Sequence, residues 1–212
     1  PPTSRNGRAM TVYPDEPWHL AGQMYVSLWL VPGAELPPVA PGTRPFRFGG
    51  RGLVAAAWVV YENDSVLHYD ELLRAVLVRD GARPRVCITD IWVDSEASMA
   101  GGRALWGIPK EMATFEVRRA HGASFVAKTG EGTLATARFT ARGRLPGRPR
   151  LAYRLAQSLD GRLKTTRVRS RATLRPARAE WTVPADSRLA ALARRAPLLS
   201  LTLRDFTLRF GG

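Results

Sequence analysis

The feature that most constrains the fold is a succession of short segments rich in β-branched and aromatic residues, separated by turns that contain glycine or proline. Such segments predict β-strands, and many strands at close spacing favour a barrel or a sandwich. Residues 69–79 also have the leucine and valine spacing of a helix, but the run Val76-Leu77-Val78 allows a strand, and we expect a strand. We therefore predict a mainly β (α+β) fold, an antiparallel β-barrel or cone with a few short helices. Its expected strands are residues 23–31, 52–61, 69–79, 86–93, 113–119, 124–128, 134–141, 151–157, 163–183 and 198–210.

Two helices interrupt this pattern. Asp94 or Ser95 can cap the first helix at its N-terminus, and Gly107 can end it. Residues 188–195 predict a second helix, which follows the possible caps Asp186 and Ser187.

Length and composition indicate a single folded domain. The chain has 212 residues, of which 45% are hydrophobic, enough for one sizeable core. We expect residues 1–10 to be a disordered lead and residues 11–212 to form the domain. No apolar run approaches the ~20 residues of a membrane span, and Cys87 is the only cysteine, which predicts a buried, inert thiol. These features favour a cytoplasmic protein without disulfides, and no cofactor is expected.

The chain carries a net charge of +14, and all but three of its 32 basic residues are arginine. Such a charge suggests nucleic-acid binding, but the arginines are scattered and no nucleic-acid-binding motif is present. An anionic substrate or a basic surface between subunits accounts for the charge as well. We expect a small-molecule substrate and a homo-oligomer, with no specific nucleic-acid partner and no membrane.

Lys110 lies in an unusual setting for a lysine. Pro109 fixes the backbone before it, and the apolar Ile108 and Met112 flank it. Lysine normally lies on solvated surface, whereas an amine that attacks a carbonyl needs an apolar, fixed position. Lys110 is therefore a candidate nucleophile, and its alternative role is that of a structural partner in an ion pair with Glu71 or Glu111.

The sequence around this lysine resembles the acetoacetate decarboxylase superfamily. The resemblance lies in Gly102-Arg103, in the run Gly107-Ile108-Pro109-Lys110, and in Tyr69-Asp70-Glu71 upstream, and weaker landmarks extend it over nearly the whole chain. It implies a β-cone or barrel in which Lys110 forms a Schiff base with a carbonyl substrate and Glu71 is a pocket carboxylate that moves protons.

The chain departs from the family at several positions. Glu111 occupies the place of a second lysine, while Gln23 and Ala56 align with a pocket arginine and a pocket glutamate. Neighbouring residues on a strand face opposite sides, so Glu111 can face away from the pocket, leaving desolvation alone to lower the pKa of Lys110. We expect weak or no decarboxylation of acetoacetate itself.

The candidate site residues follow from these motifs and from the resemblance. Lys110, Glu71 and Glu111 are the catalytic candidates, and no metal is expected because His19, His68 and His121 show no ligand spacing. The candidate substrate-binding residues are Gln23, Tyr69, Trp92, Trp106 and Ile108.

Three functions fit these residues. The first is a lyase that uses Lys110 as a Schiff-base lysine on a carbonyl substrate larger than acetoacetate, for decarboxylation, aldol, dehydration or cyclisation chemistry in natural-product biosynthesis. The second is a non-covalent cyclase or isomerase whose barrel folds a hydrophobic substrate. The third is a non-catalytic ligand-binding barrel, since a fold does not fix a function.

Overall fold

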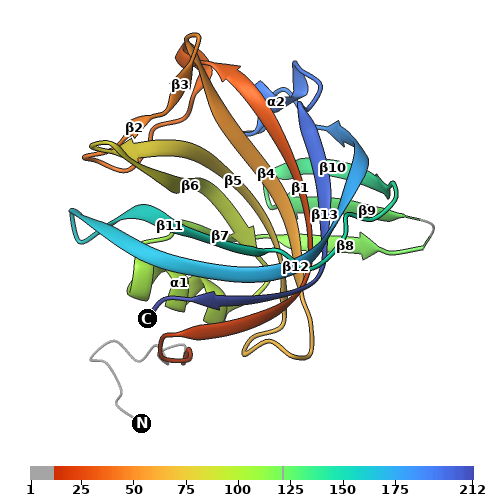
Figure 1. Cartoon of the computed structure of the whole chain (residues 1–212), viewed down its shortest axis with the longest axis horizontal. Coiled ribbons are helices and arrows are strands. Elements are labelled where there is room, and N and C mark those ends of the chain that lie inside the picture. The colour runs from red at the N-terminus through yellow and green to blue at the C-terminus, as the bar shows by residue number, and fades with distance from the viewer. Residues whose placement is uncertain (1–11, 121) are drawn as a thin grey trace.

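The computed structural model describes residues 12–120 and 122–212, and its central feature is a ring of seven strands (Figure 1). The hydrogen-bonded order is β11-β6-β5-β4-β1-β13-β12, and β11 also pairs with β12, which closes the ring. All neighbours in the ring are antiparallel except β6 and β11, whose parallel contact is the single ladder pair Leu155–Val86. The expected mainly β fold is confirmed. The ring strands are β1 (Trp18–Pro32), β4 (Arg51–Tyr61), β5 (Tyr69–Asp80), β6 (Arg83–Val93), β11 (Arg150–Leu159), β12 (Arg162–Thr182) and β13 (Leu199–Phe210).

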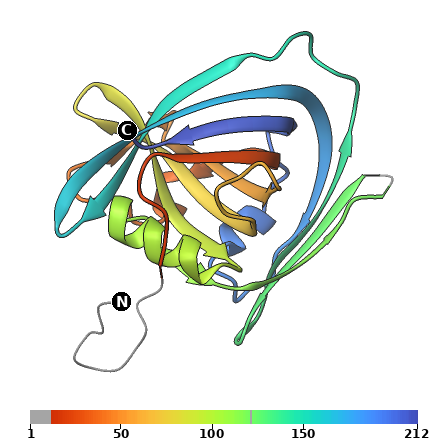
Figure 2. The same ribbon diagram turned by 90° about the horizontal axis from the view of Figure 1, so that it is seen from below.

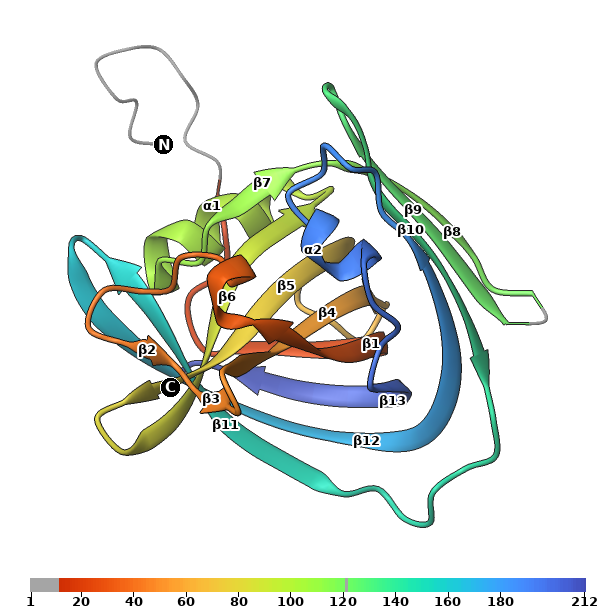
Figure 3. The ribbon, with the colours of Figure 1, turned by 90° about the horizontal axis from the view of Figure 1, so that it is seen from above.

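A smaller second sheet stands beside the ring and is joined to it by β12. This strand is 21 residues long; its first part pairs with β11 and β13, and its last part, from Ala177, pairs with β10. Figures 2 and 3 show β12 curving from the ring to the second sheet. The second sheet contains β8 (Thr114–Arg118), β9 (Ala123–Thr129) and β10 (Gly132–Ala141). The proline-rich stretch after β1 holds only short elements, η1 (Gly33–Glu35), β2 (Arg44–Pro45) and β3 (Arg47–Phe48).

Two apolar cores follow from the alternation of side chains along the strands. One core fills the ring and includes Leu20, Ile91 and Phe206. The other lies on the opposite face of the same strands, where Trp58 stacks on Phe125 of the second sheet. A residue therefore belongs to the interior of the ring or to the space between the sheets according to its position in the alternation.

The long helix α1 (Glu96–Trp106) forms where the sequence predicts it. Ser95 is its N-cap and accepts a hydrogen bond from the backbone N–H of Ser98, and Gly107 ends it at a φ of 66°. Such a positive φ favours glycine, and a Cβ there would also lie 2.1 Å from the carbonyl oxygen of Ser158. The cap fixes the direction in which the chain leaves α1 toward Lys110.

The second predicted helix is shorter than expected. α2 spans only Ala190–Ala193, and neither Asp186 nor Ser187 is its N-cap, which is Leu189. The Ser187 hydroxyl instead donates to the carbonyl of Leu134 on β10. This contact with the second sheet holds the segment in a turn, and so the helix begins later.

Three further expectations concern single segments. Residues 69–79 form a strand, as expected, within β5. Cys87 is buried in β6, and burial raises the pKa of its thiol. The expected lead of residues 1–10 lies outside the described residues. No helix in the described part of the chain is both long and apolar enough to cross a membrane.

Candidate functional site

Lys110 is the first residue of the short strand β7 (Lys110–Met112), which pairs in parallel with β6. Its ladder partner is Ile91, whose side chain belongs to the core inside the ring, and Lys110 points into the same space. The side chain is 5% exposed. The structure thus places Lys110 in a buried, fixed position, as the sequence predicts.

The Lys110 ammonium group has three hydrogen-bond acceptors. Its Nζ lies 2.8 Å from Ser98 Oγ, 3.1 Å from Glu71 Oε2 and 3.2 Å from Tyr69 Oη. Because an ammonium has three N–H donors, this arrangement satisfies all of them. The structure therefore brings together Lys110, Glu71 and Tyr69, which the sequence predicts as site residues, and adds Ser98 from α1.

The pKa of Lys110 is shifted in the direction opposite to the one that the sequence predicts. Burial lowers it, but Tyr69 and Glu71 beside the ammonium outweigh burial, so the pKa is raised above that of free lysine. The expectation that desolvation acts alone is wrong, because the carboxylate faces the amine directly. In the resting site Lys110 is an ammonium paired with a buried carboxylate.

Three tyrosines surround this pair. Tyr61 donates to Glu71 Oε1 at 3.3 Å, and burial raises its pKa well above the usual value. Burial likewise raises the pKa of Tyr69, and that of Tyr153 to about 12. All three phenols are protonated at neutral pH and add no charge; Tyr61 hydrogen-bonds to Glu71, and Tyr69 accepts a hydrogen bond from Lys110.

The space beside Lys110 is small and mostly apolar. It is a cavity of about 60 Å³ whose lining includes Trp106 and Ile108, both predicted from the sequence. Among the described residues, Lys110 and Glu71 are the only charged ones that line it. Typical ligand pockets measure ~300–1,000 Å³, so the cavity as it stands admits only a small molecule.

Small residues on α1 make room for the lysine. Ser98, Gly101 and Gly102 lie three and four positions apart and are all buried, so they share one face of the helix. A Cβ at Gly102 would come within 2.8 Å of Lys110 Cδ, and one at Gly101 within 2.5 Å of Trp18. Ser98 was not predicted from the sequence, although this spacing of small residues was the available signal.

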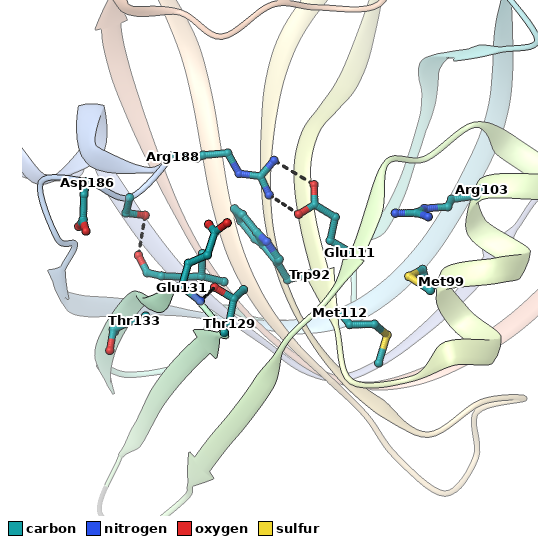
Figure 4. A pocket seen from close by; sticks show the side chains of 14 residues that line it. Trp92, Met99, Arg103, Glu111, Met112, Thr129, Glu131, Thr133, Asp186 and Arg188 are labelled. Atoms are coloured by element: carbon teal, nitrogen blue, oxygen red, sulfur yellow. Dashed lines mark hydrogen bonds and ion pairs between the residues drawn. The ribbon is translucent and has the colours of Figure 1, made fainter.

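Three predicted site residues lie outside the lysine cavity, and two of them lie on the opposite face of the ring strands. Glu111 follows Lys110 on β7 and forms a bidentate ion pair with Arg188, at 2.7 and 2.9 Å (Figure 4). Trp92 is the ladder partner of Glu111 and lies beneath the Arg188 guanidinium, 4.6 Å from it. The assignment of Trp92 to the lysine pocket is wrong, and Glu111 faces away from that pocket, as the sequence allowed, because alternation places both in a separate open cavity of about 660 Å³.

Gln23 is the third of these residues. Its amide nitrogen donates to Glu62 and to Asp205, and its amide oxygen accepts from the backbone of Asp205. Its neighbour Met24 lines the cavity instead. The alternation of β1 is unbroken here, so Met24 faces inward together with Leu20, and the extra residue of the irregular pairing lies on β13.

The described residues do not form a cluster of metal ligands. Within residues 12–120 and 122–212, no three His, Cys, Asp or Glu side chains lie close enough together to hold a metal ion.

The sequence profile of the acetoacetate decarboxylase (ADC) family matches residues 2–206 of the chain. No curated protein matches the chain significantly.

Several solved structures share the fold. The enduracididine biosynthesis enzyme MppR with HEPES buffer bound is 18% identical, with a TM-score of 0.65, over 100% of this chain and 91% of its own. Acetoacetate decarboxylase from Legionella pneumophila is 16% identical, with a TM-score of 0.68, over 99% of this chain and 91% of its own. An acetoacetate decarboxylase-like enzyme from Sphingomonas wittichii RW1 is 18% identical, with a TM-score of 0.61, over 99% of this chain and 96% of its own.

At these identities the structural matches show the fold, whereas the sequence profile spans nearly the whole chain, including the lysine and the carboxylate that meet inside the ring. The chain belongs to the acetoacetate decarboxylase family.

Proposed function

We propose that the protein is a lyase that forms an imine between Lys110 and the carbonyl group of a small keto acid. The observation that carries this proposal is the 3.1 Å contact between the Lys110 Nζ and the Glu71 carboxylate inside a small, mostly apolar cavity. A buried amine beside a buried carboxylate can lose its proton to that carboxylate and then attack a carbonyl carbon.

The chemistry can be written from these two residues. Glu71 takes a proton from the Lys110 ammonium, the free amine adds to the carbonyl, and water leaves to give an iminium ion. When the keto acid carries its carboxylate β to the carbonyl, the C–C bond breaks, its electrons move to the iminium nitrogen and carbon dioxide departs. The proton that Glu71 accepted leaves with the departing water, so Glu71 takes a new proton from solvent and gives it to the enamine carbon, after which water releases the product from Lys110.

The apolar lining favours loss of the carboxylate. Lys110 is the only cation among the described residues that line the cavity, so a substrate carboxylate would be poorly solvated there, and its departure as neutral carbon dioxide removes that charge. An enamine at Lys110 could also add to an aldehyde. MppR, which shares the fold, has been solved with pyruvate and with the condensation product of pyruvate and imidazole 4-carboxaldehyde.

The size of the cavity changes one expectation. The sequence favours a substrate larger than acetoacetate, but a space of about 60 Å³ fits a short keto acid better. We therefore propose keto acids of the size of pyruvate or acetoacetate as substrates.

Borohydride trapping tests the imine. With pyruvate or acetoacetate present, we expect reduction to leave the substrate-derived alkyl group, which is the ketone plus two hydrogens minus water, on the peptide that contains Lys110 and not on that of the exposed Lys128. Lys110→Arg should abolish both trapping and turnover, because a guanidinium is not deprotonated in proteins. Turnover by the Lys110→Arg variant without trapping would contradict the proposal.

That outcome would instead support the non-covalent cyclase or isomerase. One observation favours it as the second candidate: all three N–H groups of the Lys110 ammonium already have acceptors. In such an enzyme Lys110 would act as a fixed charge, and Lys110→Arg would keep activity that Lys110→Ala loses.

A further inference from the structure

An outer groove lies next to the lysine cavity, and one residue lines both. The groove has a volume of about 350 Å³ and is formed by residues from the β5–β6 hairpin and from β11 and β12. Tyr153 lines the groove and also the cavity that holds Lys110 and Glu71. The residue is 39% exposed, yet burial of its phenol, with a smaller effect of the Glu71 carboxylate, raises the pKa of that phenol to about 12.

The groove lies at the weakest join of the ring. β6 and β11 share only the ladder pair Leu155–Val86, whereas β11 and β12 share ten ladder pairs. Val86 lines the groove and Leu155 lines the cavity. Because so little backbone pairing links β6 to β11, side chains separate the inside of the ring from solvent at this join.

The groove is positively charged. It holds Arg85, Arg154 and Arg167, and none of the described residues that line it is acidic. Arg154 and Arg167 are direct ladder partners on adjacent strands, where like charges repel. Neither forms an ion pair with a described carboxylate, and Arg85, whose nearest carboxylate is 3.9 Å away at Asp80, has a buried Nε without a hydrogen-bond partner among the described residues.

We propose that this groove is the entry route of an anionic carbonyl substrate and that Tyr153 is the gate between groove and cavity. The three arginines attract the substrate's carboxylate from solvent, and movement of the Tyr153 ring lets the carbonyl end reach Lys110. The identity of the substrate as a keto acid rests on the function proposed above, whereas the route itself does not.

Reductive alkylation of Lys110 tests the route directly. The amine adds to an aldehyde, water leaves, and hydride from cyanoborohydride reduces the iminium to a secondary amine. Formaldehyde serves as the neutral probe and glyoxylate as the anionic probe. Any amine that these reagents reach is labelled, so the outcome does not depend on whether the enzyme turns over a keto acid. The surface residue Lys128 gives an internal reference for each protein by peptide mass spectrometry.

The gate is tested with Tyr153→Ala. We expect labelling of Lys110 by both probes to rise about tenfold or more relative to Lys128. Tyr153→Phe, which keeps the ring, should label as the unmodified protein does. Leu155→Ala is the matched control, because Leu155 lines the cavity but not the groove. An equal rise in Leu155→Ala, or no rise in folded Tyr153→Ala, would overturn the gate.

The charge of the groove is tested with the double variant Arg154→Gln/Arg167→Gln. Glyoxylate labelling of Lys110 should fall about tenfold at low salt, the lower end of electrostatic steering effects, while formaldehyde labelling stays unchanged. Arg138→Gln on the second sheet, also an exposed arginine without a described ion pair, is the control and should have no effect. A parallel fall with both probes, or no fall with glyoxylate, would exclude this groove as the anion's route.

Discussion

The state of Lys110 depends on a balance between burial and its partners. Burial favours the neutral amine, and Tyr69 and Glu71 favour the ammonium strongly enough to raise the pKa. A raised lysine pKa means that the ammonium form stabilises the folded protein, and that this contribution is lost only as pH rises through the raised value. The buried pair is therefore compatible with stability at neutral pH, and in the proposed mechanism it delays nucleophilic attack.

Glu71→Gln separates these two effects. Burial lowers the pKa of Lys110, and the Glu71 carboxylate is one of the groups that counteract this effect. Without the carboxylate, the pKa of Lys110 should fall, and the pH profile of formaldehyde labelling should shift to lower pH. Turnover should nevertheless fall by about 100-fold or more, because the variant lacks the group that moves protons. Labelling and turnover are measured across the same pH range. If both rise together, Glu71 only holds the ammonium and does not act in catalysis.

Gly102 is a second residue on which the position of Lys110 depends. Alanine there would gain about 1 kcal/mol of helix propensity, but its Cβ would lie 2.8 Å from Lys110 Cδ and displace the lysine. We expect little change in thermal stability but a loss of turnover of about 100-fold, as for a small misplacement of a reacting group. Gly130→Ala, at a turn where a Cβ would meet nothing within 4 Å, is the control and should remain fully active.

At the scale of the element, the alternation of β7 separates the chemistry of Lys110 from that of Glu111. Lys110 opposes Ile91 inside the ring, and Glu111 opposes Trp92 outside it. Glu111→Lys should therefore leave the pH profile of turnover unmoved. It should cost about 1 kcal/mol at most, the usual value of an exposed ion pair, because the partners of that pair are 44% and 48% exposed.

The matched control is Glu111→Gln, which removes the pair with Arg188 without adding a cation. Both variants are compared by pH–rate profiles and urea unfolding. A profile displaced to lower pH in the lysine variant alone would mean that residue 111 reaches the cavity.

Most elements could be predicted from the sequence because their signals are local. Alternation identifies the strands, and Ser95 and Gly107 mark the ends of α1. The side of the sheet on which a given side chain lies is harder to predict. Whether Gln23 or Met24 points inward depends on the phase of the alternation along β1, since a shift of one residue moves side chains to the other face. Trp92 was misplaced because its ladder partner, Glu111, becomes known only once β6 and β7 are paired.

At the scale of the whole molecule, closure of the ring could not be read from the sequence. It depends on β11 meeting both β12, its neighbour in the chain, and β6, about 70 positions earlier, through one ladder pair. The same weak join is where the cavity approaches the surface at Tyr153. The barrel is closed at this join by side chains more than by backbone hydrogen bonds, and for that reason we propose the join as the entry route.

Gln157 is one of the side chains that link β11 to β6 at this join. Its side chain is buried in β11, donates to the carbonyl of Ile88 on β6 at 3.0 Å, and accepts a hydrogen bond from the Cys87 thiol at 3.4 Å. Gln157→Leu keeps most of the volume but leaves both partners without this side chain, which should cost about 1–3 kcal/mol of the free energy of unfolding. Urea unfolding measures this cost.

Thr166→Val is the control for this variant, because Thr166 lies on β12 beside the same join and its buried hydroxyl has no hydrogen-bond partner in the described structure. Removal of an unpaired hydroxyl should leave the protein equally or more stable. Amide hydrogen exchange should show that Gln157→Leu speeds exchange in β11 more than in β4, on the far side of the ring. If both strands exchange faster by the same factor, Gln157 stabilises the whole domain, and the join between β6 and β11 is not its weakest point.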